Sequence, residues 1–394
     1  MIKGRTVILG ITGSIAAYKA VDIASKLTKT GTRVEVVMTE SATRFISPLT
    51  LRSVVGRPVV TSMWELSSEF SIKHVALAEV ADVVVIAPAT ASTIAHLAAG
   101  MADDMLTCTV LATKAPVIIA PAMNDNMYNN PITQENILKL KARGFIFVEP
   151  GYGRLASGKI GQGRLAEIDN ILGIIRQILG REGDLAGKKI CITAGGTKEP
   201  IDPVRFIGNR SSGKMGFALA SAARDRGAEV MLITAADWLP ETAGIKMLKV
   251  ATAAEMAKAV NNAVKTADAL IMAAAVADYR PKNYAVGKIK KDDTSLTLEL
   301  VKTLDVLMDV RGDLIKVGFA AESENLIANA RKKLKEKKLD IVVANNITDK
   351  DCGFGSDLNR VTIIDKKNRV KELPLMCKRE VADKVLDWVV DFIV

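Results

Sequence analysis

One polar loop in the second half of the chain combines residue types that could bind and activate an anionic substrate. It reads Asn209-Arg-Ser-Ser-Gly-Lys214 and lies between an apolar run that ends at Thr193 and an amphipathic pattern that starts near Gly216. Free backbone N–H groups and the dipole at the start of a helix favour an anion, and the lysine adds positive charge. The spacing is neither GxGxxG nor GxxxxGK[ST], which argues against a common dinucleotide or P-loop site. Because packing alone rarely requires these polar residues together, we expect Ser211 and Ser212 to contribute to an anion or nucleotide site.

Three small polar loops in the first half have the form of a single mononucleotide site. Gly10–Ser14, Thr39–Ser41 and Pro88–Ser92 each follow an apolar run. Serine and threonine cap helices in most proteins, so each loop alone indicates little. Together the loops could surround one mononucleotide, and the residues expected there are Gly13, Ser14, Ile15, Thr39, Ser41, Pro88, Thr90 and Ser92.

Such loops need rigid elements to position them, and the apolar pattern predicts these elements in both halves. Short apolar runs alternate with helical patterns such as Ala16–Leu27, which is typical of parallel sheets with helices on both faces. The runs are Thr6–Gly10, Arg33–Met38, Ala81–Ala87, Ala115–Ala120, Gly187–Thr193, Ala228–Thr234, Ala267–Ala273 and Leu339–Asn345. We predict two doubly wound α/β domains with mainly parallel sheets, 1–180 and 187–394, joined by the Gly-rich linker Leu179–Gly187. Ligands bind beyond the carboxyl ends of such strands, where the polar loops fall.

The composition is that of a two-domain protein with well-buried sheets. The chain has 394 residues, of which 49% are hydrophobic, and a mean hydropathy of +0.19. The net charge is +10, but the basic residues form no aromatic-rich basic face. Small phosphorylated substrates explain the charge at least as well as nucleic acid does, so we expect no nucleic-acid partner. Four separated cysteines and two histidines disfavour a Cys/His metal site. No apolar run reaches the roughly 18 residues of a membrane span, and the first strand leaves no room for a signal peptide, so we expect a cytoplasmic protein.

Longer motifs in both halves resemble those of known enzyme families. The first half is similar to FMN-dependent cysteine decarboxylases at Gly13–Lys19, His74–Ala78, Ala87–Thr90 and Pro121–Met127. The second half is similar to phosphopantothenate–cysteine ligase at Thr193–Thr197, Asn209–Gly216, Ala273–Arg280 and Lys288–Lys291. In this order, and over nearly the whole chain, the motifs resemble the bifunctional coenzyme A biosynthesis proteins of bacteria and archaea. The resemblance implies an N-terminal flavodoxin-like decarboxylase domain and a C-terminal Rossmann-like ligase domain.

For the first half, the resemblance implies decarboxylation of 4′-phospho-N-pantothenoylcysteine with FMN, which the three loops above would bind. Loss of CO2 from an acylated cysteine needs an electron acceptor β to the carboxylate, and oxidation of the thiol to a thioaldehyde supplies one; flavin accepts the two electrons and later returns the hydride. By resemblance, His74 assists oxidation and decarboxylation, and Asn124 binds the carboxylate. A lone histidine is usually a surface or core residue, and only the matched motif favours catalysis.

The flap of the first half, Gly153–Arg164, departs from the family pattern at Ser157. Relatives usually carry a cysteine there, which donates a proton during reduction of the enethiol intermediate. A free thiol has a pKa near 8.5, whereas an alkyl hydroxyl is a far weaker acid. Ser157 could act through a relayed water, Lys159 could substitute as the acid, or the last step could be impaired; an engineered change would also account for the serine.

For the second half, the resemblance implies ligation of 4′-phosphopantothenate to L-cysteine through an acyl-cytidylate, with CTP and Mg2+. Such chemistry needs positive charge around a triphosphate. By resemblance, the nucleotide residues are Ser211, Ser212, Asp278, Lys288, Thr303, Asp305, Phe319, Lys333 and Lys337. Lys288 would support formation of the acyl-cytidylate, Asn209 its conversion with cysteine, and Arg205 would hold substrate.

Several features of the second half also have simpler explanations. By composition alone, its lysines indicate a solvated face. The stretch Lys302–Val306 departs from the family's usual Asn-Pro-Asp, which makes nucleotide contacts there less secure. Glu199 and Asp202 could hold a metal, although a turn with a capping Asp202 is the simpler explanation.

Other functions predict different partners. A flavin-binding regulator of the halotolerance type would use the first half as an interaction module; Ser157 favours it slightly, whereas His74, Asn124 and an intact ligase half argue against it. A flavin prenyltransferase or reductase fused to a Rossmann domain predicts a dinucleotide fingerprint, which Gly195–Pro200 lacks. A nucleotide-binding screen would separate these functions. Selectivity for CTP would indicate the ligase, selectivity for NAD(P) the reductase, and binding of neither the regulator. The family implies a homo-oligomer, with trimeric flavin domains and dimeric ligase domains, in which His74 acts near the FMN of a neighbouring subunit.

Overall fold

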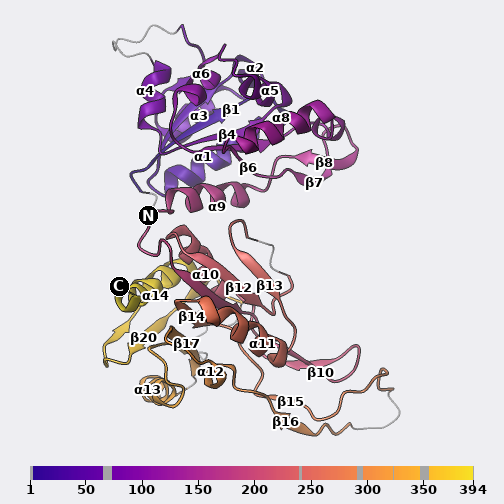
Figure 1. The fold of residues 1–394 in the computed structure, drawn as a ribbon, viewed down its shortest axis with the longest axis vertical. Helices are drawn as coiled ribbons and strands as arrows, with labels where there is room; N and C mark the ends of the chain where they lie inside the picture. The colour runs from indigo at the N-terminus through magenta and orange to yellow at the C-terminus, as the bar shows by residue number, and fades with distance from the viewer. Residues whose placement is uncertain are drawn as a thin grey trace. The chain divides into compact units, whose positions relative to one another are not determined.

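The computed structural model divides the chain into two compact units, Met1–Gly180 and Arg181–Val394 (Figure 1). The structure describes residues 3–64, 73–238, 242–290, 296–322, 324–346 and 355–393. Each unit has its own sheet and its own core.

The first unit is built on a parallel sheet, which has six strands in the described residues. The strands are β1 (Thr6–Ile11), β2 (Arg33–Met38), β3 (Val59–Val60), β4 (Val83–Ala89), β5 (Val117–Pro121) and β6 (Ile146–Phe147). Their order is β3-β2-β1-β4-β5-β6, and without the two-residue β3 it is the flavodoxin order. The strands β1, β4 and β5 are buried throughout, which explains why the sequence shows continuous apolar runs rather than alternation. Both β4 and β5 extend past their predicted ends, Ala87 and Ala120, and include the prolines that follow, Pro88 and Pro121.

Helices cover both faces of this sheet. One face packs against the short helix η1 (Ile15–Lys19), α1 (Ala20–Lys29), α3 (Pro48–Val55) and α9 (Ile168–Leu179). The other packs against α4 (Lys73–Val80), α5 (Ala91–Ala99), α6 (Met105–Ala112) and α8 (Pro131–Ala142). The short helices α2 (Glu40–Thr43) and α7 (Asp125–Tyr128) follow β2 and β5, and β7 (Gly151–Arg154) pairs with β8 (Ile160–Arg164) in an antiparallel hairpin. The doubly wound prediction is therefore confirmed for this unit.

The second unit repeats the arrangement with a larger sheet, of order β13-β12-β9-β14-β17-β18-β20-β21. The strands are β9 (Lys189–Ala194), β12 (Glu229–Thr234), β13 (Lys246–Lys249), β14 (Ala269–Met272), β17 (Ile315–Glu322), β18 (Ile341–Asn346), β20 (Val361–Asp365) and β21 (Val370–Glu372). Pairing is parallel from β13 to β18 and antiparallel beyond it. The parallel part has the Rossmann order, so the Rossmann-like prediction is also confirmed.

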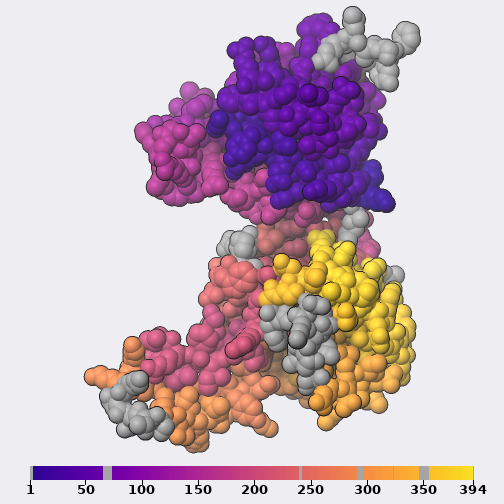
Figure 2. All heavy atoms as spheres, turned by 180° about the vertical axis from the view of Figure 1, so that it is seen from behind, coloured from indigo at the N-terminus to yellow at the C-terminus, as the bar shows by residue number. Residues whose placement is uncertain are grey.

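Helices again lie on both faces, and an arm projects from this unit. The helices α10 (Lys214–Asp225) and α14 (Lys378–Ile393) cover one face, and α11 (Ala253–Ala263), α12 (Val306–Asp309) and α13 (Leu326–Glu336) cover the other. The arm consists of two antiparallel pairs, β10 (Lys198–Pro200) with β11 (Phe206–Gly208), and β15 (Tyr279–Pro281) with β16 (Leu300–Lys302). Figure 1 shows β10, β15 and β16 extending beyond the main sheet, and in Figure 2 atoms of the same colours protrude from the second unit.

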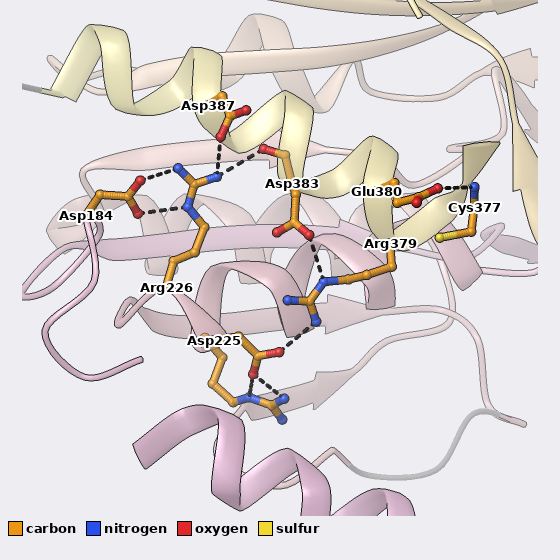
Figure 3. A network of polar contacts seen from close by, with 9 residues as sticks. Asp184, Asp225, Arg226, Cys377, Arg379, Glu380, Asp383 and Asp387 are labelled. Carbon is orange, nitrogen blue, oxygen red and sulfur yellow. Dashed lines mark hydrogen bonds and ion pairs between the residues drawn. The ribbon is translucent and has the colours of Figure 1, made fainter. Parts of the chain in front are cut away.

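The segment 181–187, predicted to be part of a linker, belongs to the second unit. Leu185 has an exposed fraction of 0% and joins the core beside α10. Arg226, at the end of α10, binds Asp184 through both carboxylate oxygens and also donates to Asp387 Oδ1 (2.9 Å) and the Asp383 carbonyl oxygen (3.0 Å) on α14 (Figure 3). The second unit therefore begins at Arg181, because these contacts order the Gly-rich segment.

Neighbouring ion pairs extend this network along α14. Arg379 on α14 reaches Asp225 Oδ2 (2.6 Å) and Asp383 Oδ2 (3.2 Å), and Arg224 binds the other oxygen of Asp225 (Figure 3). Since Arg226 and Asp225 are almost fully buried, these pairs fix the last helix against α10.

Within the described ranges, no helix is long and apolar enough to cross a membrane, and no group of three or more His, Cys, Asp or Glu side chains could hold a metal ion. Cys108, Cys191 and Cys377 are free thiols, and Cys352 lies outside the described residues.

Candidate active sites

The polar loops of the first unit meet where its strand order reverses, between β1 and β4. Thr12, after β1, donates its hydroxyl to the Pro88 carbonyl oxygen (2.8 Å) and accepts from the Thr90 N–H (3.0 Å). Ser14 donates to the Ala122 carbonyl oxygen after β5 (3.2 Å). A Cβ on Gly13 would lie 2.5 Å from the Ser41 Cβ, so only glycine lets the loops after β1 and β2 approach so closely. Loops that are far apart in the sequence therefore form one edge, at the position where such sheets bind ligands.

Three of these residues also start helices. Ser14 caps η1, Thr39 caps α2 and Thr90 caps α5, each by accepting a backbone N–H. These three residues therefore do cap helices, and their positions also bring the starts of three helices to one edge of the sheet. Hydroxyl and N–H donors, with no carboxylate among the predicted residues, fit a phosphate group. Ile15 and Ser41 lie exposed at this edge, as does Ser92 in α5.

Asn124 joins the same edge and contacts the base of the flap. The Ala122 N–H donates to the Ala89 carbonyl oxygen (3.0 Å), and the Met123 N–H donates to the Gly163 carbonyl oxygen on β8 (2.9 Å). Asn124 caps α7 by accepting the Asn126 N–H (2.9 Å). The loop that carries Asn124 is thus held between the β4 loop and the flap.

The two remaining predicted groups of the first unit lie outside this cluster of loops. His74 is partly exposed in the first turn of α4, beside residues 65–72, which the structure does not describe. Ser157 is exposed in the turn between β7 and β8, where the Gly158 N–H donates to the Leu155 carbonyl oxygen (2.9 Å). Neither side chain has a described contact with the loops after β1, β2 or β4.

The second unit has a cavity of about 910 Å3 at its own reversal of strand order, between β9 and β14. It contains every predicted nucleotide residue except Lys288, namely Ser211, Ser212, Asp278, Thr303, Asp305, Phe319, Lys333 and Lys337, together with Asn209. A cavity of this size can enclose a nucleotide and a second small molecule.

One wall of the cavity is the loop that joins β11 to α10. Asn209 donates its side-chain amide to the Val276 carbonyl oxygen (3.0 Å) in the loop after β14. Gly216, in the first turn of α10, lies against the end of β9, where an added Cβ would be 2.5 Å from the Ala194 Cβ. The start of α10 is therefore packed directly on the strand that precedes the loop. Lys214, which we expected to add charge at this place, instead donates to Asp357 Oδ1 (2.7 Å) and to the Gly355 carbonyl oxygen (2.9 Å).

The opposite wall carries two lysines from α13 and the residue after it. Lys333 donates to the Phe319 carbonyl oxygen (2.8 Å), and Lys337 pairs with Asp305 Oδ2 (3.0 Å), which also caps α12. Burial, and then the positive charge of Lys337, lower the pKa of Lys333, although three nearby carboxylates oppose the shift. A polyanion bound in the cavity would offset this lowering of the pKa, because its negative charge would stabilise the ammonium form of Lys333.

Arg205 and Lys288 lie on the arm and do not line the cavity. The Arg205 guanidinium donates to the Ile289 carbonyl oxygen (3.2 Å), next to the exposed Lys288. Lys291, the last residue of the Lys288 motif, lies outside the described residues.

Comparisons with known proteins match each half of the chain to a known family. The Flavoprotein family matches residues 1–180, and the family of the DNA/pantothenate metabolism flavoprotein C-terminal domain matches residues 185–393. The coenzyme A biosynthesis bifunctional protein CoaBC of Bacillus subtilis is 45% identical over 98% of this chain and 97% of its own length. The chain belongs to the CoaBC family. The protein of that name from Mycobacterium tuberculosis is 41% identical over 99% of this chain and 97% of its own length.

Two solved structures similar to this CoaBC family member each cover about half of the chain. The C-terminal domain of a coenzyme A biosynthesis bifunctional protein CoaBC is 39% identical, with a TM-score of 0.46, over 53% of this chain and 97% of that one. The FMN-dependent cysteine decarboxylase SpaF is 35% identical, with a TM-score of 0.38, over 41% of this chain and 92% of that one.

Sequence reasoning missed several polar residues that line the cavity of this CoaBC family member. They are Asn345, Asn359 and Lys378, whereas Arg210 and Lys302 line the cavity within stretches that the sequence analysis had already considered for nucleotide binding. Asn345 had a usable signal, because it lies near the carboxyl end of β18, where polar residues of parallel sheets face ligands. Lys378 had none, since only the fold brings the start of α14 to this cavity.

Proposed function

We propose that this bifunctional enzyme of coenzyme A biosynthesis first ligates 4′-phosphopantothenate to L-cysteine with CTP and Mg2+, and then decarboxylates the product to 4′-phosphopantetheine with FMN. We assign decarboxylation to residues 1–180 and ligation to 187–394. The observation that carries the proposal is the single cavity that collects the residues expected to bind a nucleotide, all but Lys288.

In the ligase half, the two walls of the cavity suit different parts of the reaction. Lys333 and Lys337 offer positive charge to a triphosphate, and a bound Mg2+ would share that task. Ser211 and Ser212, before α10, offer hydroxyl and N–H donors to a second anionic group. Asn209 lies in the same loop as Ser211 and Ser212, where we propose that its side-chain amide orients the acyl group for attack by the cysteine amine. We assign support of acyl-cytidylate formation to Lys288 and substrate binding to Arg205.

In the decarboxylase half, the edge between β1 and β4 suits a flavin mononucleotide. Gly13, Ser14, Ile15, Thr39, Ser41, Pro88, Thr90 and Ser92 are the residues we assign to FMN. Bound FMN would supply two-electron oxidation of the substrate thiol and the later reduction. We assign Asn124 to the substrate carboxylate and His74 to proton transfer, and the flap that touches the Asn124 loop would cover the substrate.

We propose that the enzyme is a homo-oligomer, with paired ligase units and trimeric flavin units. The arm of the second unit exposes large apolar side chains, among them Phe206, Tyr284 and Val286, and the first unit exposes Ile15 and Tyr18 near its loop edge. Apolar surfaces of this kind are typical of interfaces. Because CTP is a cytoplasmic metabolite, we propose a cytoplasmic location.

The test is to incubate the purified protein with FMN, Mg2+, CTP, 4′-phosphopantothenate and cysteine, and to identify the products by mass spectrometry. Formation of 4′-phosphopantetheine would support both activities. Accumulation of the oxidised, decarboxylated enethiol would support the ligase and the first flavin step and would locate a defect at Ser157. Absence of any acylated cysteine, together with no preference for CTP in binding, would refute the ligase and favour a flavin-binding regulator.

A further inference from the structure

A buried carboxylate organises the turn of the arm between β10 and β11. Asp202 has a side-chain exposed fraction of 0%. Its Oδ1 accepts the N–H groups of Val204 (2.8 Å) and Arg205 (2.7 Å), which closes the turn. The pKa of Asp202 lies below its usual range because these N–H donors and Arg205 outweigh the effect of burial.

The second oxygen of this carboxylate leaves the turn and binds the segment that carries Lys288. Asp202 Oδ2 accepts the Ile289 N–H (3.2 Å) and lies 3.4 Å from the Arg205 guanidinium. Arg205 also donates to the carbonyl oxygen of Ile289 (3.2 Å), so both backbone groups of that residue are bound by the turn. On the other side of Lys288, the Ala285 N–H donates to the Ile201 carbonyl oxygen (3.0 Å). The backbone is therefore fixed before and after Lys288, while the lysine side chain is exposed.

The same turn leads directly to Asn209. Asn209 follows β11, whose residues pair with β10 on the other side of the turn. The β10–β11 hairpin thus connects the two residues that we assign to the two steps of ligation. Its turn binds the segment that carries Lys288, and its second strand leads to Asn209. The side chain of a lysine on an exposed segment can adopt many positions. A fixed backbone reduces the number of these positions before the substrate binds.

We propose that Asp202 is a positioning residue for Lys288. Its carboxylate holds the segment that carries Lys288 against the β10–β11 hairpin, which leads to Asn209, during acyl-cytidylate formation. This inference rests on the proposed ligase function and on the role assigned there to Lys288. It gives Arg205 a second task, because its guanidinium binds Asp202 and Ile289 together.

The substitution Asp202→Asn separates this task from the closing of the turn. The amide oxygen can keep both turn N–H groups at Oδ1, while the amide NH2 replaces Oδ2 and faces the Ile289 N–H, donor against donor. We expect kcat for pyrophosphate release from CTP with 4′-phosphopantothenate to fall at least about 10-fold, because modest misplacement of a reacting group has effects of this size. The KM for CTP should stay within about twofold, since Lys333 and Lys337 are unchanged.

Asp365 provides a matched control in the same unit. Its side chain is also fully buried, its Oδ1 accepts two turn N–H groups, from Lys367 and Arg369, and its Oδ2 binds the Arg369 guanidinium (2.6 Å). It has no described contact with the Lys288 segment. Asp365→Asn should therefore reproduce any general loss of stability and leave kcat within about twofold of the unsubstituted enzyme.

Five results distinguish the possible failures. Equal kcat values for Asp202→Asn and Asp365→Asn, or a change in the KM for CTP alone, would overturn the positioning role. If Lys288→Ala leaves pyrophosphate release unchanged, the role of Lys288 fails and the inference fails with it. If Lys288→Ala slows the step and Asp202→Asn does not, only the inference fails. If the unsubstituted enzyme releases no pyrophosphate from CTP, the proposed ligase function is wrong.

Discussion

The contact between α10 and β9 leads to a sharp prediction for Gly216→Ala. An added Cβ would lie 2.5 Å from the Ala194 Cβ and 2.7 Å from the Thr193 carbonyl oxygen, and real Cβ atoms do not approach closer than 3.0 Å. The helix and the strand must therefore separate by at least about 0.5 Å, at a cost of about 1–3 kcal/mol in the free energy of unfolding. Because the cavity wall Ser211–Gly213 leads into this helix, it must move as well.

This displacement should slow ligation without affecting decarboxylation. A misplacement of about 1 Å can reduce a rate about 100-fold, so a shift half as large predicts a decrease of about 10-fold in pyrophosphate release. The assay is steady-state pyrophosphate release at a temperature well below unfolding, with decarboxylation of supplied 4′-phospho-N-pantothenoylcysteine as the internal reference. The reference should not change, because that site lies in the other unit.

Ser221→Thr is the matched control on the same helix. Ser221 is partly exposed and two turns of helix separate it from the first residue of α10, so the extra methyl group should change neither rate. A normal rate of pyrophosphate release in Gly216→Ala, with unchanged stability, would show that the contact with β9 does not set the cavity wall, and the reasoning would be wrong.

Three further predictions concern an acid, a base and a structural charge. Ser157→Cys should raise the ratio of 4′-phosphopantetheine to enethiol by mass spectrometry, because a thiol is the stronger acid; an unchanged ratio would point to another proton donor. The KM for CTP should rise as pH increases through the lowered pKa of Lys333, because CTP prefers the ammonium form, and Lys333→Met should abolish this dependence in a KM-against-pH profile. Arg226→Met should destabilise the second unit by about 2–3 kcal/mol, and calorimetry should show its melting temperature lowered by about 5–10 °C while the first unit is unaffected; a smaller shift would mean that hydration of the half-exposed Asp184 and Asp387 replaces the arginine.

The sequence predicted the sheets and the edges where ligands bind, because both depend on local patterns. Continuous apolar runs such as those of β1 and β4 are required by burial on both faces, and polar loops after them follow from the direction of parallel strands. The resemblance added the nucleotide residues, and the cavity brings them together apart from Lys288.

The rest depends on contacts between distant parts of the chain. Lys214 is the last residue of the predicted anion loop, but its ammonium group pairs with Asp357, which lies far along the sequence. Lys378 reaches the cavity only because α14 packs beside α10. The segment around Leu185 has the composition of a linker, and only the positions of Arg226 and the core beside α10 show why it is ordered.

The anchoring of residues 181–187 determines where this chain can be divided. A cut between Gly180 and Arg181 would leave Leu185 in the core of the second unit and Asp184 bound to Arg226. The ligase half would therefore keep the contacts that its first residues make. A cut after Gly187 would remove both residues, open a hole beside α10 and leave a buried guanidinium with fewer partners. Separate genes for the two activities would therefore be compatible with this fold only if the second protein retained the short segment before β9.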